Sequence, residues 1–222
     1  PHNLKGNREA LPLRTLHDDL LQRSGGSWDE PPKSVNWEPI HQSLRDSVIL
    51  QFENEMCWGF KDPRSLFCLE GWLEALPRME CVGIIRNPEE VALSLQARNG
   101  MSIEKGLRLW TNYNTRLINW HDQLGFPLIH FGNDLQDFKL QAADLIGKLK
   151  LPRLLNVDEL KFCEPSLFHQ QASKRILPQE VQDLYHELFQ RSMQSQKVVK
   201  PGLTSFFGID ISKSLLSFFS KG

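Results

Sequence analysis

Two basic residues stand directly before an Asp-Pro or Asn-Pro pair, and that placement suits the binding of an anion. Lys61 precedes Asp62-Pro63, and Arg86 precedes Asn87-Pro88. Asp or Asn followed by Pro is typical of a helix start, because the first caps the opening turn and proline fits its first position. The N–H groups of that turn and the helix dipole favour a negative charge beside the basic side chain. The pattern therefore predicts two corners that can bind anions.

A short apolar run comes directly before each of these basic residues. Cys57–Phe60 ends at Lys61, and residues 81–85 end at Arg86. A continuous apolar run is typical of a strand that a parallel sheet buries on both faces. Ligands of open α/β sheets bind beyond the carboxyl ends of such strands. Either basic residue alone is explained as a solvated charge, but two at consecutive strand ends favour a binding site.

Ser94 adds a hydroxyl group to the second corner. It follows Arg86 by eight residues, which places it about two turns into the helix that Asn87 would cap. A planar guanidinium can bind a phosphate through two parallel hydrogen bonds, and a serine hydroxyl can donate another. Arg86 and Ser94 are therefore the candidate phosphate ligands.

The elements that must position these residues alternate between strand and helix. Helical spacing and capping residues predict helices around Leu13–Leu21, from Asp62 to Pro77, from Asn87 onward, and over 103–123, 134–149 and 178–190; a further strand is predicted over 127–131 and a loop over 24–39. Strand–helix–strand alternation with short loops favours a three-layer α/β domain with a central parallel sheet.

Composition excludes several classes of protein. The chain is 40% hydrophobic and 24% charged, with a net charge of -1, so no basic field favours nucleic acid or an anionic membrane. No apolar run approaches the roughly 18 residues that a membrane span needs. The four cysteines and seven histidines form no metal-ligand pattern, so we expect no metal site. We expect a cytoplasmic protein of bacterial type.

The motifs resemble those of the sulfotransferase superfamily, in its bacterial-type and tyrosylprotein branches. The closest matches are K-D-P-R at 61–64 and R-N-P-E-E-V-A-L-S at 86–94. Residues 5–18 resemble the bacterial K-G-x-W-E … L-H-D block, with Arg8 in place of tryptophan, and residues 130–135 resemble the strand followed by Y-E-D-L. These matches span roughly residues 3–190 in the family's order. The resemblance implies a P-loop-type sulfotransferase fold over residues 1–200, with a tail of uncertain role over 201–222.

The resemblance also implies a donor and a division of roles. The donor would be 3′-phosphoadenosine 5′-phosphosulfate (PAPS), and the product 3′-phosphoadenosine 5′-phosphate (PAP). Arg86 and Ser94 would bind the 3′-phosphate, and Lys61 would lie near the transferred sulfuryl group. Arg64 would either contact the donor or form a salt bridge with Glu70 or Glu74.

A hydroxyl acceptor also requires a general base. The family's block places a carboxylate at Glu9, which makes it the first candidate. His17, about two helical turns further on, is the second, because an unperturbed imidazole has a pKa of about 6.5. For Glu9 the alternative is a capping or surface carboxylate, and for His17 it is a solvated or core-edge imidazole.

The family's 5′-phosphosulfate loop and the strand before it should lie upstream of Lys5. Gly25-Gly26-Ser27 follows a helix instead of a strand, so it reads as a loop. We therefore expect that the N-terminal strand and the phosphosulfate loop are missing from the given chain.

Neither the acceptor nor the activity is fixed by these motifs. A small molecule, a glycan, a lipid or a peptide could accept the sulfuryl group, through a hydroxyl or an amine. One alternative is a non-catalytic nucleotide-binding or scaffolding module of the same fold. Another is a P-loop kinase-like enzyme, against which stands the lack of an aspartate at the end of an apolar strand.

Overall fold

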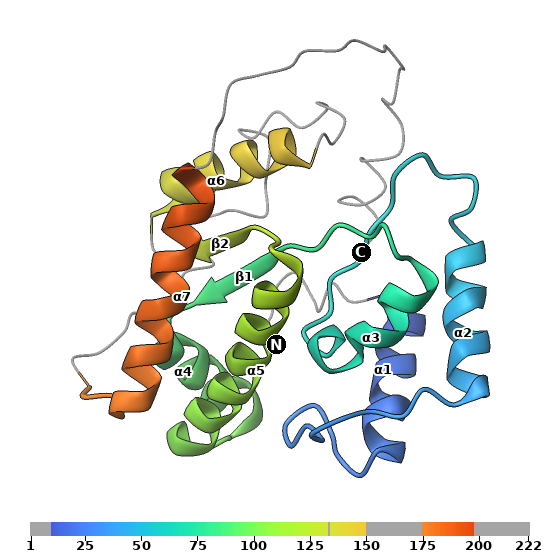
Figure 1. Ribbon diagram of the computed structural model, residues 1–222. Helices are drawn as coiled ribbons and strands as arrows, with labels where there is room; N and C mark the ends of the chain where they lie inside the picture. Colours follow the sequence, from blue (N-terminus) through green and yellow to red (C-terminus); the bar gives the residue numbers. More distant parts are fainter. Residues whose placement is uncertain (1–9, 133, 150–174, 198–222) are drawn as a thin grey trace. The chain divides into compact units, whose positions relative to one another are not determined.

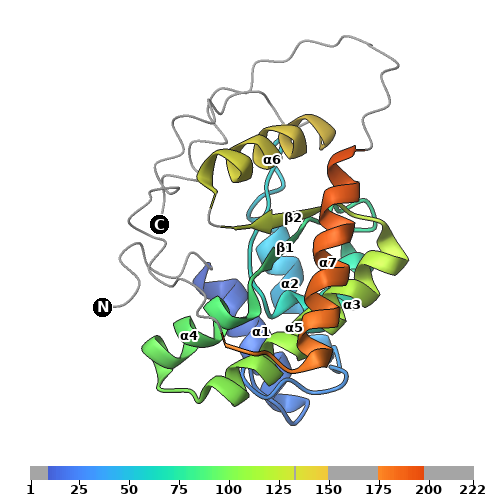
Figure 2. The same cartoon turned by 90° about the vertical axis from the view of Figure 1, so that its left-hand side faces the viewer.

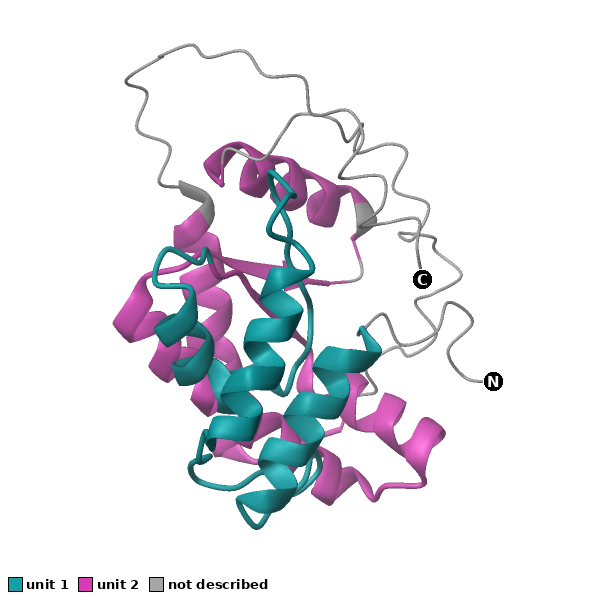
Figure 3. Cartoon of the chain, turned by 90° about the vertical axis from the view of Figure 1, so that its right-hand side faces the viewer, with its two compact units in different colours: residues 1, 3–80, 213–222 teal, residues 2, 81–212 magenta. Residues whose placement is uncertain are grey.

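The computed structural model describes residues 10–132, 134–149 and 175–197 of the chain. These residues belong to two compact units (Figure 3). Unit 1 comprises the described residues up to 80, and unit 2 comprises those from 81 onward. Glu9 and the tail 201–222 lie outside the described residues.

The described part of unit 1 contains three helices: α1 (Leu11–Arg23), α2 (Pro39–Leu50) and α3 (Ser65–Ala75) (Figure 1). The leucines that predicted the first helix all lie in the core: Leu13, Leu16, Leu20 and Leu21. Full burial of each such side chain contributes about 1.5–3 kcal/mol to folding. The prediction of this amphipathic helix is confirmed.

Helix α2 has no counterpart in the sequence prediction, which ends with a loop through residue 39. The loop stops at Glu38, whose side chain accepts a hydrogen bond from the third residue of the helix, while the His41 side chain accepts one from the Glu38 backbone N–H. These two reciprocal hydrogen bonds between Glu38 and His41 form a capping box. Pro39 at the first helical position is an ordinary start signal, but Glu and His are not the residues that normally indicate a capping box, and this helix was not predicted.

The segment before α3 is not a strand, so the prediction of a strand over Cys57–Phe60 is wrong. Aromatic packing holds it instead. Trp58 stacks on Phe52 with ring centroids 4.9 Å apart, and Phe60 packs against Trp72 at 4.7 Å. A strand needs a neighbour for its backbone groups, and the described part of unit 1 contains no strand. The half-buried rings of this run therefore pack against other side chains of unit 1 rather than forming part of a sheet.

Helix α3 packs closely against the ring of Trp37. A Cβ atom at Gly71 would lie 2.2 Å from a ring atom of Trp37, so only glycine allows this approach. The Trp37 and Trp72 rings then meet edge to face, with centroids 6.3 Å apart. A larger residue at position 71 would displace the half-buried Trp37 ring from its contact with α3.

Unit 2 is an α/β unit, and its described residues form two parallel strands with helices packed against them. In chain order the elements are β1 (Gly83–Arg86), α4 (Pro88–Asn99), α5 (Ile103–Leu124), β2 (Leu128–Phe131), α6 (Leu135–Lys148) and α7 (Gln179–Lys197). Strand β1 pairs with β2 in parallel, with Ile85 opposite His130. Helices α4 and α5 form the crossover that parallel pairing requires. The prediction of an α/β fold with a parallel sheet is confirmed at this level.

Helices lie on both faces of the two-stranded sheet (Figures 1 and 2). On one face, His130 meets the rings of Tyr185 and Phe189 from α7. On the other face, Phe131 packs against Phe138 from α6 with ring centroids 4.9 Å apart. Side chains of successive strand residues point to opposite faces, so one short strand reaches both helical layers.

Burial of β1 differs from the prediction of a strand covered on both faces. Ile85 is fully buried, but Ile84 is 53% exposed. On the Ile84 face of the sheet, the contact between Phe131 and Phe138 brings α6 over β2. The face of β1 that carries Ile84 is therefore open among the described residues of unit 2.

The ends of α4 are marked by residues with clear physical roles. Pro88 occupies the first turn, and Gly100 follows the last residue with φ +67°, a left-handed conformation that favours glycine. None of the helices described in the structure is both long and apolar enough to cross a membrane.

Candidate functional site

Arg86 is the last residue of β1, at the carboxyl end of the strand and just before α4. Its guanidinium lies over the ring of Phe131, 5.3 Å from the centroid. Its backbone carbonyl accepts a hydrogen bond of 3.0 Å from the indole N–H of Trp110 in α5. The side chain therefore projects from a backbone that is fixed on two sides, by the sheet and by Trp110.

The guanidinium of Arg86 lacks the hydrogen bonds that it could make. Its Nε atom is buried and donates to no acceptor among the described residues. The Glu90 carboxylate lies 3.5 Å away, within ion-pair range but without hydrogen-bond geometry. A buried donor without an acceptor costs about 1–3 kcal/mol. The side chain as a whole is 31% exposed, so an incoming anion can reach the exposed part of the guanidinium and satisfy its charge.

Asn87 caps α4 as the sequence predicts. Its side-chain oxygen accepts hydrogen bonds from the backbone N–H groups of Glu89 and Glu90, at 2.9 and 3.2 Å. Both glutamates are buried, and Glu89 lies 3.7 Å from the Arg175 guanidinium. The positive end of the α4 dipole thus already faces two carboxylates of its own helix. An external anion at this corner would depend mainly on the arginine side chain at the strand end.

Ser94 lies further along the same helix and is half-buried. Arg86 and Ser94 are therefore carried by one strand–helix connection of unit 2, as the sequence predicts. Their roles as phosphate ligands remain a prediction.

A second polar group lies on the other face of the sheet, where the His130 Nε2 atom is 2.9 Å from the Tyr185 hydroxyl. Burial lowers the pKa of His130, although the charges of Asp137 and Glu90 act in the opposite direction. Burial and the Glu90 charge raise the pKa of Tyr185, against a hydrogen bond with Asn87. Both groups are consequently neutral near pH 7.

A cavity of about 580 Å³ opens beside Tyr185, between the start of α4 and helix α7. Its lining mixes charged, polar and apolar side chains, among them Asn87, Arg175, Gln182, Tyr185, His186 and Phe189. The cavity thus reaches the α4 cap from the α7 side of unit 2. Sequence reasoning did not find this group, because α7 joins it from a segment distant along the chain.

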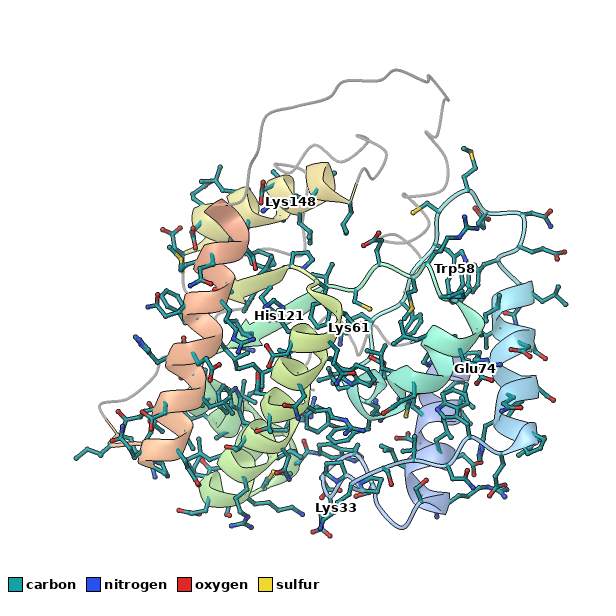
Figure 4. The ribbon with its side chains drawn as sticks, in the orientation of Figure 1. Lys33, Trp58, Lys61, Glu74, His121 and Lys148 are labelled. Atoms are coloured by element: carbon teal, nitrogen blue, oxygen red, sulfur yellow. The ribbon has the colours of Figure 1, made fainter. Side chains whose placement is uncertain are left out.

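The other predicted corner lies in unit 1, on the segment between α2 and α3 that carries Trp58 and Lys61 (Figure 4). Lys61 is exposed. Because Cys57–Phe60 is not a strand, Lys61 does not end a strand, which corrects the sequence prediction. Helix α3 begins at Ser65, so Asp62 lies in a turn ahead of the helix rather than at its cap.

Asp62 is the centre of a buried hydrogen-bond network. Its Oδ1 atom accepts from the backbone N–H and the Nη1 of Arg64, at 3.0 and 2.9 Å. Its Oδ2 atom lies 2.9 Å from Nδ1 of His17. Burial by itself would raise the pKa of Asp62, but the His17 hydrogen bond and the Arg64 contacts outweigh it and hold that pKa below 3.8. Asp62 is therefore an ionised, fully buried carboxylate at neutral pH.

His17 has no exposed surface, and both of its ring nitrogens have partners. The Trp72 indole N–H donates to Nε2 at 2.8 Å. An indole nitrogen can only donate, so Nε2 must be the acceptor and Nδ1 must carry the proton that is donated to Asp62. A general base needs an accessible lone pair, and here the lone pair points at Trp72. The geometry therefore favours a structural role for His17, as a buried imidazole that links Trp72 to Asp62, over the role of general base.

Arg64 also differs from its predicted role. It forms salt bridges with Asp62 and with Asp18, whose Oδ1 lies 2.6 Å from the arginine Nε at an angle poorer than that of a regular hydrogen bond. These partners replace the predicted Glu70 or Glu74. Burial would lower the pKa of Arg64, but the two carboxylates outweigh burial and raise it. The guanidinium is engaged inside unit 1, which disfavours a contact with the donor.

The predicted site residues thus fall into two groups. Lys61, His17 and Arg64 belong to unit 1, Arg86 and Ser94 belong to unit 2, and Glu9 lies outside the described residues. In the described ranges no group of three or more His, Cys, Asp and Glu side chains could hold a metal ion. Comparison with protein-family models, curated proteins and solved structures found no match.

Sequence reasoning missed the partners that complete each group, chiefly Trp72 and Tyr185. It treated Asp62 only as a helix cap. One signal was available, since the His17-Asp18 pair and the Asp62 … Arg64 pair carry complementary groups. Spacing alone cannot show that two such pairs meet, because they are separated by a loop and a helix.

Proposed function

We propose that this protein is a sulfotransferase that takes a sulfuryl group from PAPS and transfers it to a hydroxyl or an amine. The observation that carries the proposal is the state of Arg86. Its guanidinium stands at the carboxyl end of a parallel strand, is partly exposed, and has a buried N–H without an acceptor. An anion beside the exposed part of this guanidinium would form charge-assisted hydrogen bonds with it.

The sequence motifs support PAPS as the source of the anion. Many nucleotides carry phosphates, but the ordered K-D-P-R and R-N-P … S motifs resemble those of enzymes that recognise a 3′-phosphate. We assign the 3′-phosphate to Arg86, with the Ser94 hydroxyl as a second ligand. This placement requires no metal ion, because the arginine provides the positive charge.

The reaction would be an in-line transfer. The acceptor oxygen or nitrogen forms a bond to sulfur while the bond from sulfur to the bridging oxygen breaks, and the acceptor proton passes to a base. Lys61 would neutralise the negative charge that develops on the departing phosphate. Glu9 stays the proposed base, whereas His17 is replaced in that role because its acceptor nitrogen is bound to Trp72.

A calorimetric titration tests the assignment of Arg86. We expect Arg86→Ala to weaken binding of PAP by about 2–4 kcal/mol, because a partly buried phosphate would lose its charged partner. Adenosine 5′-phosphate, which lacks the 3′-phosphate, should bind wild type and Arg86→Ala equally. Comparing both ligands on both proteins forms a thermodynamic cycle: a loss seen only with PAP assigns the Arg86 contact to the 3′-phosphate.

Arg98→Ala is the matched control, since Arg98 is an exposed arginine at the other end of α4. It should leave the affinity for PAP unchanged. Equal loss in both variants, or equal sensitivity of the two ligands to Arg86→Ala, would contradict the 3′-phosphate assignment. Absence of PAP binding to wild type would refute the proposed donor altogether.

A further inference from the structure

We infer that His17 is a positioning residue, which sets the conformation of the turn that presents Lys61 by holding Asp62. This inference rests on the proposed function for the role of Lys61, but the geometry of the turn stands independently of it. The two residues that flank Lys61 in sequence are both fixed by the same buried pair, His17 and Trp72.

The residue before Lys61 is held by ring packing. The Phe60 ring lies 4.7 Å from the Trp72 ring and 6.2 Å from the His17 ring, measured between centroids. Trp72 is fully buried in α3, so its ring provides a rigid surface. The Phe60 side chain is therefore anchored toward the core of unit 1.

The residue after Lys61 is held by hydrogen bonds. Asp62 accepts from His17 through one oxygen and from the Arg64 backbone and side chain through the other. Its backbone carbonyl also accepts from the Ser65 backbone N–H at 3.1 Å. With both neighbours pointing inward, the exposed Lys61 side chain is carried on a fixed backbone.

The tautomer of His17 determines which ring nitrogen donates a hydrogen bond and which accepts one. Nε2 accepts from Trp72, so Nδ1 carries the proton, and that proton meets an ionised carboxylate. Asp18, the next residue of α1, is 2.6 Å from the Arg64 side chain. Helix α1 thus contacts the turn through two consecutive residues: His17 binds Asp62, and Asp18 pairs with Arg64. Support of this kind holds a functional side chain within the narrow geometry that chemistry requires.

Two substitutions of His17 separate positioning from packing. The amide nitrogen of His17→Asn can take the place of Nδ1 and still donate to Asp62, but nothing then accepts from Trp72. The amide oxygen of His17→Gln can take the place of Nε2 and accept from Trp72, while the donor to Asp62 is lost. Both variants cost stability, so each measurement is corrected for the global free energy of unfolding.

The first readout is hydrogen exchange of the Arg64 backbone amide, which donates to Asp62 and requires no ligand. We expect exchange in His17→Asn to stay within about threefold of wild type, and exchange in His17→Gln to be about tenfold faster or more. Equal acceleration in both variants, or faster exchange in His17→Asn, would overturn the inference, because His17 would then serve Trp72 rather than the turn.

The second readout is the affinity for PAPS relative to PAP, which reports on the sulfuryl group that Lys61 would contact. We expect His17→Gln and Lys61→Ala to lower this ratio by about fivefold, and His17→Asn to preserve it. A ratio that falls equally in both His17 variants would assign His17 a direct role at the donor and refute positioning. If wild type binds neither ligand, the proposed function fails, while the Arg64 exchange still decides whether His17 sets the turn.

Discussion

The two basic corners of this protein share a sequence pattern but differ in how their arginines are used. Each has an Asx-Pro pair ahead of a helix and an arginine beside it. In unit 1, Arg64 is paired with the carboxylates of Asp18 and Asp62. In unit 2, Arg86 has one carboxylate at ion-pair distance and a buried N–H without an acceptor. In the first, closed corner the arginine charge is neutralised by carboxylates of the same unit. In the second, open corner the arginine could still accept an external anion as a partner.

This difference follows from what packs against each corner. Helix α1 brings His17 and Asp18 against the unit 1 turn, and their groups complement those of Asp62 and Arg64. At the unit 2 corner the carboxylate at ion-pair distance from Arg86 is that of Glu90, which belongs to α4 and does not reach hydrogen-bond geometry. A motif of four residues therefore does not fix a role, because neighbouring helices decide whether its charge is neutralised.

Removing Asp62 should have the largest effect. Asp62→Ala leaves the His17 N–H and the Arg64 amide buried without an acceptor, so we expect a loss of about 3–5 kcal/mol in the free energy of unfolding. Urea denaturation monitored by tryptophan fluorescence measures it. Glu74→Ala, which removes a 63% exposed member of an ion pair, should cost no more than about 1 kcal/mol. Similar losses in both variants would mean that the network is not what holds this corner.

The two arginines should differ in their contribution to stability. We expect Arg64→Ala to destabilise the protein by about 2–4 kcal/mol, because it leaves the buried Asp62 carboxylate without a cation. Arg86→Ala should cost less than about 1 kcal/mol, since its guanidinium makes no hydrogen bond in the described structure. Equal losses in denaturant titrations of the two variants would remove the contrast between a closed and an open corner.

Glu90 offers a smaller test of the open corner. Its carboxylate lies 3.5 Å from the Arg86 Nε atom, so it would compete with an incoming anion for Arg86 and repel the proposed phosphate. We expect Glu90→Gln to strengthen binding of PAP by about threefold to tenfold, as one nearby negative charge is removed. Calorimetry on this variant beside Arg86→Ala measures the change. Weaker binding would show that Glu90 orients the guanidinium instead of competing for it.

The two units should also respond differently to acid, and this is the smallest effect that we predict. The folded-state pKa of His130 is lowered from 6.5, so its contribution to stability is complete above that pH and falls as the unfolded chain takes up the proton. The folded-state pKa of Asp62 is lowered from 3.8. The contribution of Asp62 to stability is therefore complete above about pH 3.8. It is lost as the pH falls through the folded-state pKa of Asp62.

Unfolding free energies of wild type and His130→Gln between about pH 8 and pH 5 test this order. The stability of wild type relative to the variant should decrease below about pH 6.5. An increase on acidification would contradict the direction given for His130. Asp62→Asn should change stability by a constant amount over the same range.

Elements with local signals could be predicted from the amino-acid sequence. Leucine spacing defined α1, the Asn87-Pro88 pair defined the start of α4, and apolar runs defined β1 and β2. Caps and periodicity act over a few residues, so they can be read without knowing what lies opposite. The placement of Arg86 at a strand end and of Ser94 on the following helix was predictable for the same reason.

Which charged groups find partners could not be predicted in this way, because it depends on tertiary contacts. The tertiary structure showed that Cys57–Phe60 packs through its aromatic rings rather than in a sheet, and that His17 is sealed between Trp72 and Asp62. It also left the Arg86 guanidinium short of acceptors. Such pairings join side chains that are far apart along the chain. Because the groups are buried, losing one pairing changes the free energy of unfolding by several kcal/mol, which is comparable to the net stability of a domain.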